Sequence, residues 1–166
     1  VLAGYREIPG FAPMIKGVQM IQDKVIPLLA ACKDNPDALP TNAVSWSGHH
    51  YLLVSPDFRL SRPQAVALCG KLQGHLLAIG SLEEQKWIAS TFLAKCTQPL
   101  WLNGTCVIHT KQWTWANGEP WEFKNWAPNQ PDNAGGSEFC LAILPSGLWV
   151  DQGPAAGYAF IIEWDR

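Results

Sequence analysis

The chain has 166 residues, 48% of them apolar, which is enough for one domain with a hydrophobic core and a short appendage. A formal net charge of −2 and the lack of a basic cluster argue against nucleic acid as the main partner. We expect no membrane span, since no apolar run is long enough, and the Val at position 1 suggests a processed chain or a piece of a longer one.

The first 45 residues differ in pattern from the rest. Apolar side chains recur at helical spacing between Met14 and Cys32, which predicts an amphipathic helix. The stretch KDNPDALPTN that follows has the composition of a linker. Such a helix must pack on the domain that follows or on another subunit, and we favour the first. We therefore predict a helical extension with a linker over residues 1–45 and a domain over residues 46–166.

The next elements alternate between strands and helices. HHYLLV (His49–Val54) predicts a first strand, and HLLAI (75–79) a second short one. Ser61 and Ser81 are each followed three residues later by Gln or Glu, a capping-box pattern that opens a helix, and the second helix should end near Lys95. Two helices followed by a run of strands indicate an α+β fold. The later strands are expected in PLWLNGTCVI, QWTWA, FCLAIL, GLWVD and GYAFIIEW.

A long loop interrupts these strands. Ala127–Ser137 shows no periodicity, and an unstructured stretch of this length in a small domain is usually functional or disordered. Tryptophans on both sides argue against disorder. Gln130, Asp132, Glu138 and Asp151 bring oxygen donors into or just after the loop. We expect an ordered loop that presents these oxygens to a ligand such as a calcium ion.

The five cysteines are an odd number, so at least one is free or pairs outside the chain. None has the CxxC spacing of a zinc site. Cys96 and Cys106 are the best candidate pair because they bracket a short segment, and a disulfide there would add ~3 kcal/mol of stability. The alternative, five buried thiols that act as small hydrophobic side chains, stays equally open.

The sequence gives little support to an enzyme. It has no G-x-S-x-G, Walker, H-E-x-x-H or G-x-G-x-x-G motif. Asp132 and Glu138 form a conceivable glycosidase pair, but nothing identifies which would be the acid. The four histidines, His49, His50, His75 and His109, are scattered, and we expect no metal or catalytic role for them. We predict that the protein is not an enzyme.

From about Trp46 to Arg166 the chain resembles a C-type lectin-like domain. Trp101-Leu102-Asn103-Gly104 stands where the family has its W-I-G-L core motif. The resemblance implies a compact α+β fold with two helices, mixed antiparallel sheets and a long ligand-binding loop. The other matching segments follow in order: GHL at 74–76, SLEEQKWI at 81–88, WTWANGEP at 113–120, NW at 125–126, SEFC at 137–140, LWVD at 148–151 and FIIEW at 160–164.

The resemblance also implies roles for the loop residues. Gln130-Pro131-Asp132 stands where family members carry Glu-Pro-Asn or Gln-Pro-Asp, whose flanking oxygens bind calcium and two sugar hydroxyls together. The Gln-Pro-Asp form is associated with galactose-type sugars. Glu138 matches a further calcium ligand, and Asp151 matches the Asp of the Trp-Asn-Asp motif. The implied metal ligands are therefore Gln130, Asp132, Glu138 and Asp151.

Three departures from the family pattern change these expectations. Val150 replaces the Asn of Trp-Asn-Asp, so one ligand oxygen is missing and a weakened calcium site is expected. Cys69 and Cys140 have lost the partners of the two usual disulfides, with Ile162 in the place of one of them. This pattern looks more like the disulfide-poor branch found in bacteria. It weakens the expectation, implied by the family, of a secreted or cell-surface protein.

Two functions follow from this sequence. The first is a module that binds a glycan or glycoprotein through calcium, with Trp121, which lies between turn residues, as an exposed stacking surface for the sugar. The second is a lectin-like domain that binds a protein, or mediates assembly, without an ion. Val150, the lost disulfides and the N-terminal helix favour the second, and the loop sequence favours the first.

Overall fold

The structure is a computed structural model and describes residues 23, 26–27, 29–30 and 39–165. The chain divides into two compact units, Val1–Thr41 and Asn42–Arg166. The helix expected between Met14 and Cys32 lies largely outside the described residues, although Ile26, Pro27, Leu29 and Ala30 are helical. Its packing and the 45/46 boundary stay predictions. None of the described helices is both long and apolar enough to cross a membrane.

Two helices begin where the capping patterns predict them. In α3 (Arg62–Lys71), the side chain of Gln64 accepts hydrogen bonds from both the N–H and the hydroxyl of Ser61. In α4 (Leu82–Thr91), the Ser81 hydroxyl accepts from the N–H of Glu84 at 3.1 Å. These contacts satisfy N–H groups that a helix start leaves without a partner. A 3₁₀ turn, η3 (Leu93–Lys95), completes the second helical segment near its predicted end.

The strands form one mixed sheet of eight strands in the order β1-β2-β8-β4-β6-β7, with β3 paired to β8 and β5 paired to β4. The β4–β8 pair is parallel, and the other pairs are antiparallel. Among the residues that the structure describes, β1 is the one strand that the sequence did not predict. The strands are β1 (Val44–Trp46), β2 (His49–Leu53), β3 (His75–Leu76), β4 (Leu100–Val107), β5 (Gln112–Trp115), β6 (Cys140–Ile143), β7 (Trp149–Gln152) and β8 (Ala159–Trp164).

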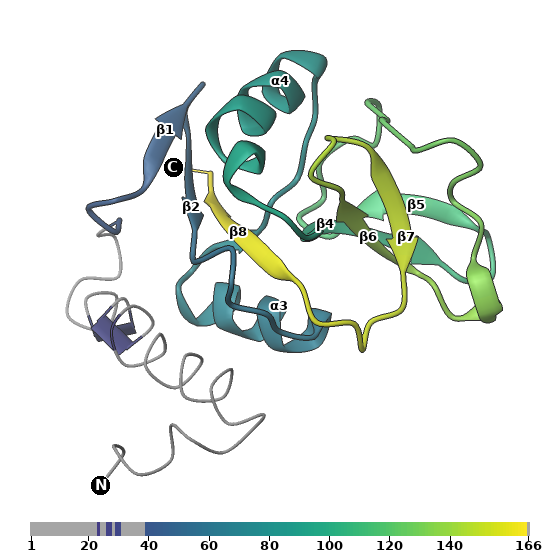
Figure 1. Cartoon of the computed structure of the whole chain (residues 1–166), viewed down its shortest axis with the longest axis horizontal. Coiled ribbons are helices and arrows are strands. Elements are labelled where there is room, and N and C mark those ends of the chain that lie inside the picture. Colours follow the sequence, from purple (N-terminus) through teal and green to yellow (C-terminus); the bar gives the residue numbers. More distant parts are fainter. Residues whose placement is uncertain (1–22, 24–25, 28, 31–38, 166) are drawn as a thin grey trace, which may run out of the picture. The chain divides into compact units, whose positions relative to one another are not determined.

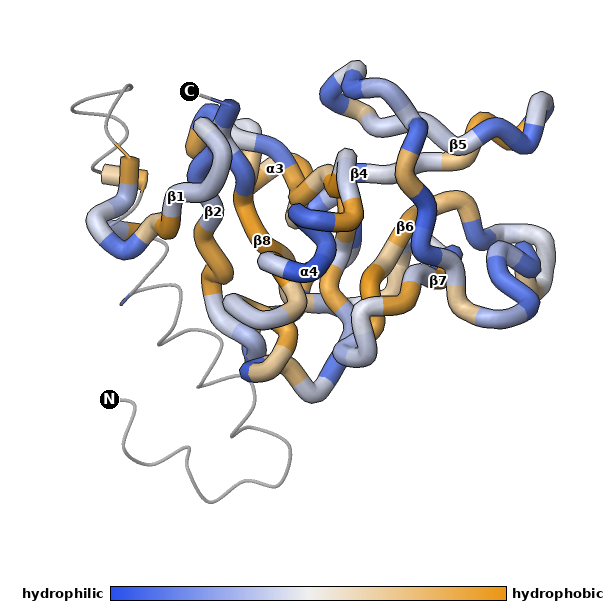
Figure 2. The backbone as a smooth tube through the Cα atoms, turned by 90° about the horizontal axis from the view of Figure 1, so that it is seen from above, coloured by the Kyte–Doolittle hydropathy of each residue, from blue (hydrophilic) through white to orange (hydrophobic). Residues whose placement is uncertain are grey.

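The centre of the domain is β8. All six of its residues are buried, and α3 and α4 lie on opposite sides of it (Figure 1). The hydrophobic colours run along β2, β8 and β6 (Figure 2). Large side chains fill this core, and two of its buried indole N–H groups find acceptors: Trp101 donates to the Leu60 carbonyl at 2.9 Å and Trp164 to the Leu72 carbonyl at 2.8 Å.

The described cysteines are all free. Cys96 and Cys106, the pair favoured by their spacing, form no disulfide, so that prediction is wrong. The physical reason is that Cys96 is buried after η3, where its thiol donates to the Phe92 carbonyl, whereas Cys106 lies far along β4. Cys69 and Cys140 are buried free thiols as well. Burial raises the pKa of the Cys69 thiol to about 12, which keeps it neutral and unreactive.

Candidate functional site

The long loop joins β5 to β6 and lies at the end of the sheet that carries β6 and β7 (Figure 1). Its only regular piece is the 3₁₀ turn η4 (Ala134–Gly136). The middle of the loop is hydrogen-bonded to β7: the Trp149 N–H donates to Asn125 and the Ala127 N–H donates to Trp149, both at 2.8 Å. The loop is therefore ordered by backbone pairing, as predicted from its tryptophans.

A cluster of indole rings supports the loop from below. Trp149 is fully buried, and its N–H donates to the Gln85 side chain at 2.9 Å. Ring centroids of Trp115, Trp121 and Trp126 lie 5.6, 5.8 and 6.2 Å from that of Trp149. Edge-to-face and tilted pairs of this kind add to the stability gained by burial alone. The cluster fixes the loop on both sides of its irregular centre.

Three carboxyl groups converge above this cluster. Asp132 and Glu138 come from the loop and Asp151 from β7, and their ligand oxygens all lie within 4.8 Å of one another. Asp151 is only 1% exposed, Glu138 is half-buried and Asp132 is exposed. The buried acid of the group, Asp151, thus comes from a strand of the sheet, and the loop adds the other two acids.

Backbone hydrogen bonds hold the Gln130–Asn133 turn onto Asp151. The two Asp151 oxygens accept from the N–H groups of Asp132 and Asn133 at 3.1 and 2.7 Å. In return, the N–H of Asp151 donates to the amide oxygen of Gln130 at 3.2 Å. The Gln130–Pro131 peptide bond in this turn is cis. The turn is therefore fixed to β7 from both directions.

The other two acids share one donor. The N–H of Ala134 lies 3.1 Å from Asp132 Oδ1 and 2.9 Å from Glu138 Oε2. Burial, followed by the charges of Asp151 and Asp132, raises the pKa of Glu138, and the hydrogen bond from Ala134 opposes this rise. No described Lys or Arg forms an ion pair with the three carboxylates. A cation would relieve their mutual repulsion.

The donor chemistry fits a hard cation. Calcium takes about 6–8 oxygen ligands, and this group offers three carboxylates with oxygens only. Each oxygen of Asp151 already accepts one N–H, but a carboxylate oxygen has two lone pairs. The amide oxygen of Gln130 faces the backbone of Asp151 and would have to serve both partners. The side chain of Val150 has no oxygen and does not line the cavity beside the acids, and a weakened calcium site stays a prediction.

A cavity of about 240 Å³ opens beside the acids. Its lining includes the apolar side chains of Trp113 and Ile108, the cationic side chain of Lys111 and the three acids. Trp113 is half-buried, whereas Trp115, two residues further from the hairpin turn on the same face of β5, is fully buried. The sequence pointed to Trp121 as the stacking surface, so the apolar lining formed by Trp113 was missed.

Trp121 lies elsewhere than the sequence suggested. It is half-buried, and its ring contacts Trp113, Trp115, Trp126 and Trp149, with the Trp115 centroid at 4.5 Å. It is not among the residues that line the cavity. The turn residues on both sides of Trp121 indicated exposure, but the neighbouring indole rings cover it. Its role in ligand binding stays a prediction.

The sequence model of the protein family described as 'Lectin C-type domain' matches residues 59–161 of this chain. The chain belongs to the C-type lectin family. It is 32% identical over 108 residues to perlucin from Haliotis laevigata, which covers 62% of this chain and 69% of perlucin. It is 34% identical over 123 residues to asialoglycoprotein receptor 2 from Rattus norvegicus, which covers 70% of this chain but only 38% of that receptor.

The fold agrees with this assignment. The carbohydrate-recognition domain of the human scavenger receptor C-type lectin superposes with a TM-score of 0.70 at 26% identity, covering 78% of this chain and all of that domain. The predicted α+β lectin fold is thus confirmed. These relatives are lectins and receptors, which are binding proteins, so the prediction that the chain is not an enzyme is confirmed too. The bacterial assignment finds no support, because the relatives are animal proteins.

Proposed function

We propose that this lectin domain binds a glycan or glycoprotein through a calcium ion held by Asp132, Glu138 and Asp151, with Gln130 beside them. The convergence of the three carboxylates within 4.8 Å is the observation that carries the proposal. The order Gln130-Pro131-Asp132 supports a galactose-type sugar, as it does in the family that the sequence resembles. The kinship to a receptor named for asialoglycoproteins supports a glycoprotein ligand.

The cavity supplies the second half of a sugar site. A pyranose has one face of C–H groups, and the half-buried ring of Trp113 offers an apolar surface next to the acids. Sugar hydroxyls would contact the ion and Asp132, while the apolar face rests on Trp113. In this proposal Trp113 takes the stacking role that the sequence suggested for Trp121, and Trp121 supports it at a centroid distance of 6.1 Å.

The test compares calcium-dependent binding of galactose and mannose by titration calorimetry. The wild type should bind galactose in calcium and lose it in chelator. The double substitution Gln130→Glu with Asp132→Asn converts the loop to the Glu-Pro-Asn form and should shift preference to mannose. Asp57→Asn, an exposed acid before α3, serves as the matched control and should bind as the wild type does. No calcium-dependent sugar binding on a broad glycan array would contradict the proposal.

One observation favours a second candidate, a calcium-independent protein-binding domain. Both oxygens of Asp151 and the amide of Gln130 are already engaged by backbone partners, so the loop closes on itself without an ion. Val150 removes a further ligand. Capture of a protein partner with equal affinity in calcium and in chelator would favour this alternative. A secreted or cell-surface location is part of the proposal in either case.

A further inference from the structure

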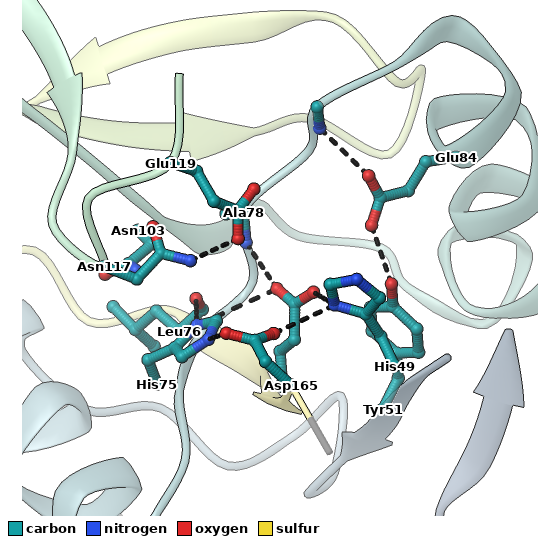
Figure 3. A network of polar contacts seen from close by, with 12 residues as sticks. His49, Tyr51, His75, Leu76, Ala78, Glu84, Asn103, Asn117, Glu119 and Asp165 are labelled. Atoms are coloured by element: carbon teal, nitrogen blue, oxygen red, sulfur yellow. Dashed lines mark hydrogen bonds and ion pairs between the residues drawn. The ribbon is translucent and has the colours of Figure 1, made fainter. Parts of the chain in front are cut away.

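A second group of titratable side chains lies where β2 and β3 pair with β8 (Figure 3). In the strand register, Glu163 of β8 is opposite Tyr51 of β2 on one side and opposite His75 of β3 on the other. His49 and Asp165 extend the group at the ends of β2 and β8. Residues that are far apart in the sequence thus converge on one short segment of rigid backbone.

His75 and Asp165 of this group, together with Glu119, have atoms placed to share one ion. A nitrogen of His75 and carboxylate oxygens of Glu119 and Asp165 lie within 4.8 Å of one another. The shortest approach is 2.8 Å, between His75 Nε2 and Asp165 Oδ2. The side chains of His75 and Asp165 are 23% and 44% exposed, so a solute can reach them. Glu119 is brought to this place by the loop that follows β5.

Each of the three side chains is oriented by a further contact. His75 Nδ1 lies 2.8 Å from the Leu76 carbonyl, which can only accept, so Nδ1 donates there and Nε2, which is in hydrogen-bond contact with Asp165 Oδ2, is the nitrogen left to bind an ion in place of that contact. His49 Nδ1 lies 2.9 Å from Asp165 Oδ1. The Asn117 amide donates to Glu119. Metal-ligating residues characteristically have such orienting partners.

The surrounding charge favours a cation. The carboxylates of Glu84, Glu119 and Asp165 lie close enough to Glu163 for their charges to act on it. In the part of the chain that the structure describes, only His49 and His75 form ion pairs with Glu163 and Asp165, and no Lys or Arg does. His75 Nε2 therefore lies among several carboxylates.

We propose that His75, Glu119 and Asp165 bind a divalent transition-metal ion of the Zn²⁺ class, separate from the loop of the calcium proposal. One imidazole nitrogen and two carboxylates are a donor set that suits zinc and its neighbours, whereas calcium takes oxygen alone. Three protein ligands leave a fourth position for water. The side-chain oxygen of Asn117, which is buried and has no hydrogen-bond partner among the described residues, would accept a hydrogen bond from that water.

The geometry requires only a small adjustment. Ligands about 2.0–2.1 Å from a tetrahedral zinc ion are about 3.3 Å apart. His75 Nε2 and Asp165 Oδ2 are 2.8 Å apart, so they must separate by roughly half an ångström to hold an ion. Asp165 follows the last strand and is exposed, which permits this movement. His75 stays fixed by β3.

The experiment uses the full chain after treatment with chelator. Titration with Zn²⁺ by calorimetry, and with Co²⁺ by visible absorption, should show saturable binding of one ion and the intense bands of a four-coordinate site. His75→Ala and Glu119→Gln should each weaken binding at least about tenfold, and Asn117→Ala, which removes an orienting contact, about tenfold. Circular dichroism confirms that each variant is folded.

Three control variants isolate the site. His50→Ala removes an imidazole that is next to His49 in the sequence but contacts the Ser45 hydroxyl and not the proposed site. His109→Ala removes an exposed imidazole from the hairpin. Asp57→Asn removes an exposed acid that belongs to neither group. All three should bind zinc as the wild type does. The proposal is overturned if the wild type shows no saturable uptake of Zn²⁺ or Co²⁺, or if His75→Ala and Glu119→Gln bind these ions with unchanged affinity.

Discussion

This domain has two clusters of acidic side chains, and each contains one acid that is 1% exposed. The two buried acids find different hydrogen-bond partners. Asp151, under the loop, accepts two backbone N–H groups from the turn that it anchors. Glu163, in the sheet, accepts one N–H from Ala78 and otherwise faces His49 and other acids. The first arrangement fixes a loop and presents oxygens to solvent. The second leaves charge unbalanced in a rigid framework, which a proton or a metal ion can neutralise.

The largest effect is expected from Asp151. Asp151→Asn retains the size of the side chain but replaces an oxygen with an amide that repels the N–H groups of Asp132 or Asn133. It also removes the one buried charge of the acidic group. We expect calcium-dependent sugar binding to fall at least about 100-fold, which is about 2.7 kcal/mol. Calorimetry with galactose measures this, with Asp57→Asn as control, and unchanged affinity would separate Asp151 from the ligand site.

The tryptophan cluster should show the next effect. Trp149→Phe removes the N–H that donates to Gln85 and leaves a void among the surrounding indole rings. We expect a loss of about 2–4 kcal/mol in the free energy of unfolding, measured in urea. Trp87→Phe, a partly buried ring on α4 outside the loop, is the comparison and should cost less. A smaller loss at Trp149 than at Trp87 would mean that the cluster does not support the loop.

Two glycines give a matched pair. A Cβ at Gly104 would lie 2.6 Å from Leu141 Cδ2 and 2.9 Å from Leu141 Cβ, between β4 and β6, where nothing can move freely. Gly104→Ala should therefore cost about 1–3 kcal/mol. A Cβ at Gly70 in α3 meets nothing within 4 Å, so Gly70→Ala should stabilise by about 0.5–1 kcal/mol. Urea unfolding of both variants should show opposite signs, and equal signs would contradict the packing described.

The pH dependence of stability tests the second group. The pKa of Glu163 is about 9 in the folded state, well above its ordinary value of about 4.3, so its contribution is fully present below that value and is lost as the pH rises through 9. In chelator, the free energy of unfolding should fall by about 1–3 kcal/mol between pH 5 and 8. Glu163→Gln should flatten this slope, and Glu122→Gln, an exposed acid, should leave it unchanged. Equal slopes of the free energy of unfolding against pH in all three proteins would contradict the claim that Glu163 is buried among other acids.

Local patterns predicted much of the fold. Ser61 and Ser81 opened helices because capping depends on residues only three positions apart, and the later strands lie within the segments that were expected to form them. The strand β1 was missed because its three residues carry too little pattern. The Cys96–Cys106 prediction failed because spacing in sequence says nothing about the direction in which a strand carries its side chains away.

The residues of the candidate site could be named from the sequence, but their surroundings could not. Gln130 and Asp132 lie in the loop, and Glu138 and Asp151 follow it, so all four were named as oxygen donors before the family pattern gave them roles. Trp113 was not expected at the site, because its exposure depends on where β5 leaves the covered part of the sheet. The histidine group was invisible, since 26 residues separate His49 from His75 and only the pairing of β2 and β3 with β8 brings them together.

The central claim is that the loop between β5 and β6, supported by the tryptophan cluster, holds three acids close enough to bind calcium. Thermal melting of the wild type, once in calcium and once in chelator, tests it most directly. A ligand that binds only the folded state raises the melting temperature with its concentration. We predict a rise of several degrees at saturating calcium that is lost in Asp132→Asn combined with Glu138→Gln. Identical melting curves for the wild type in calcium and in chelator would contradict the account.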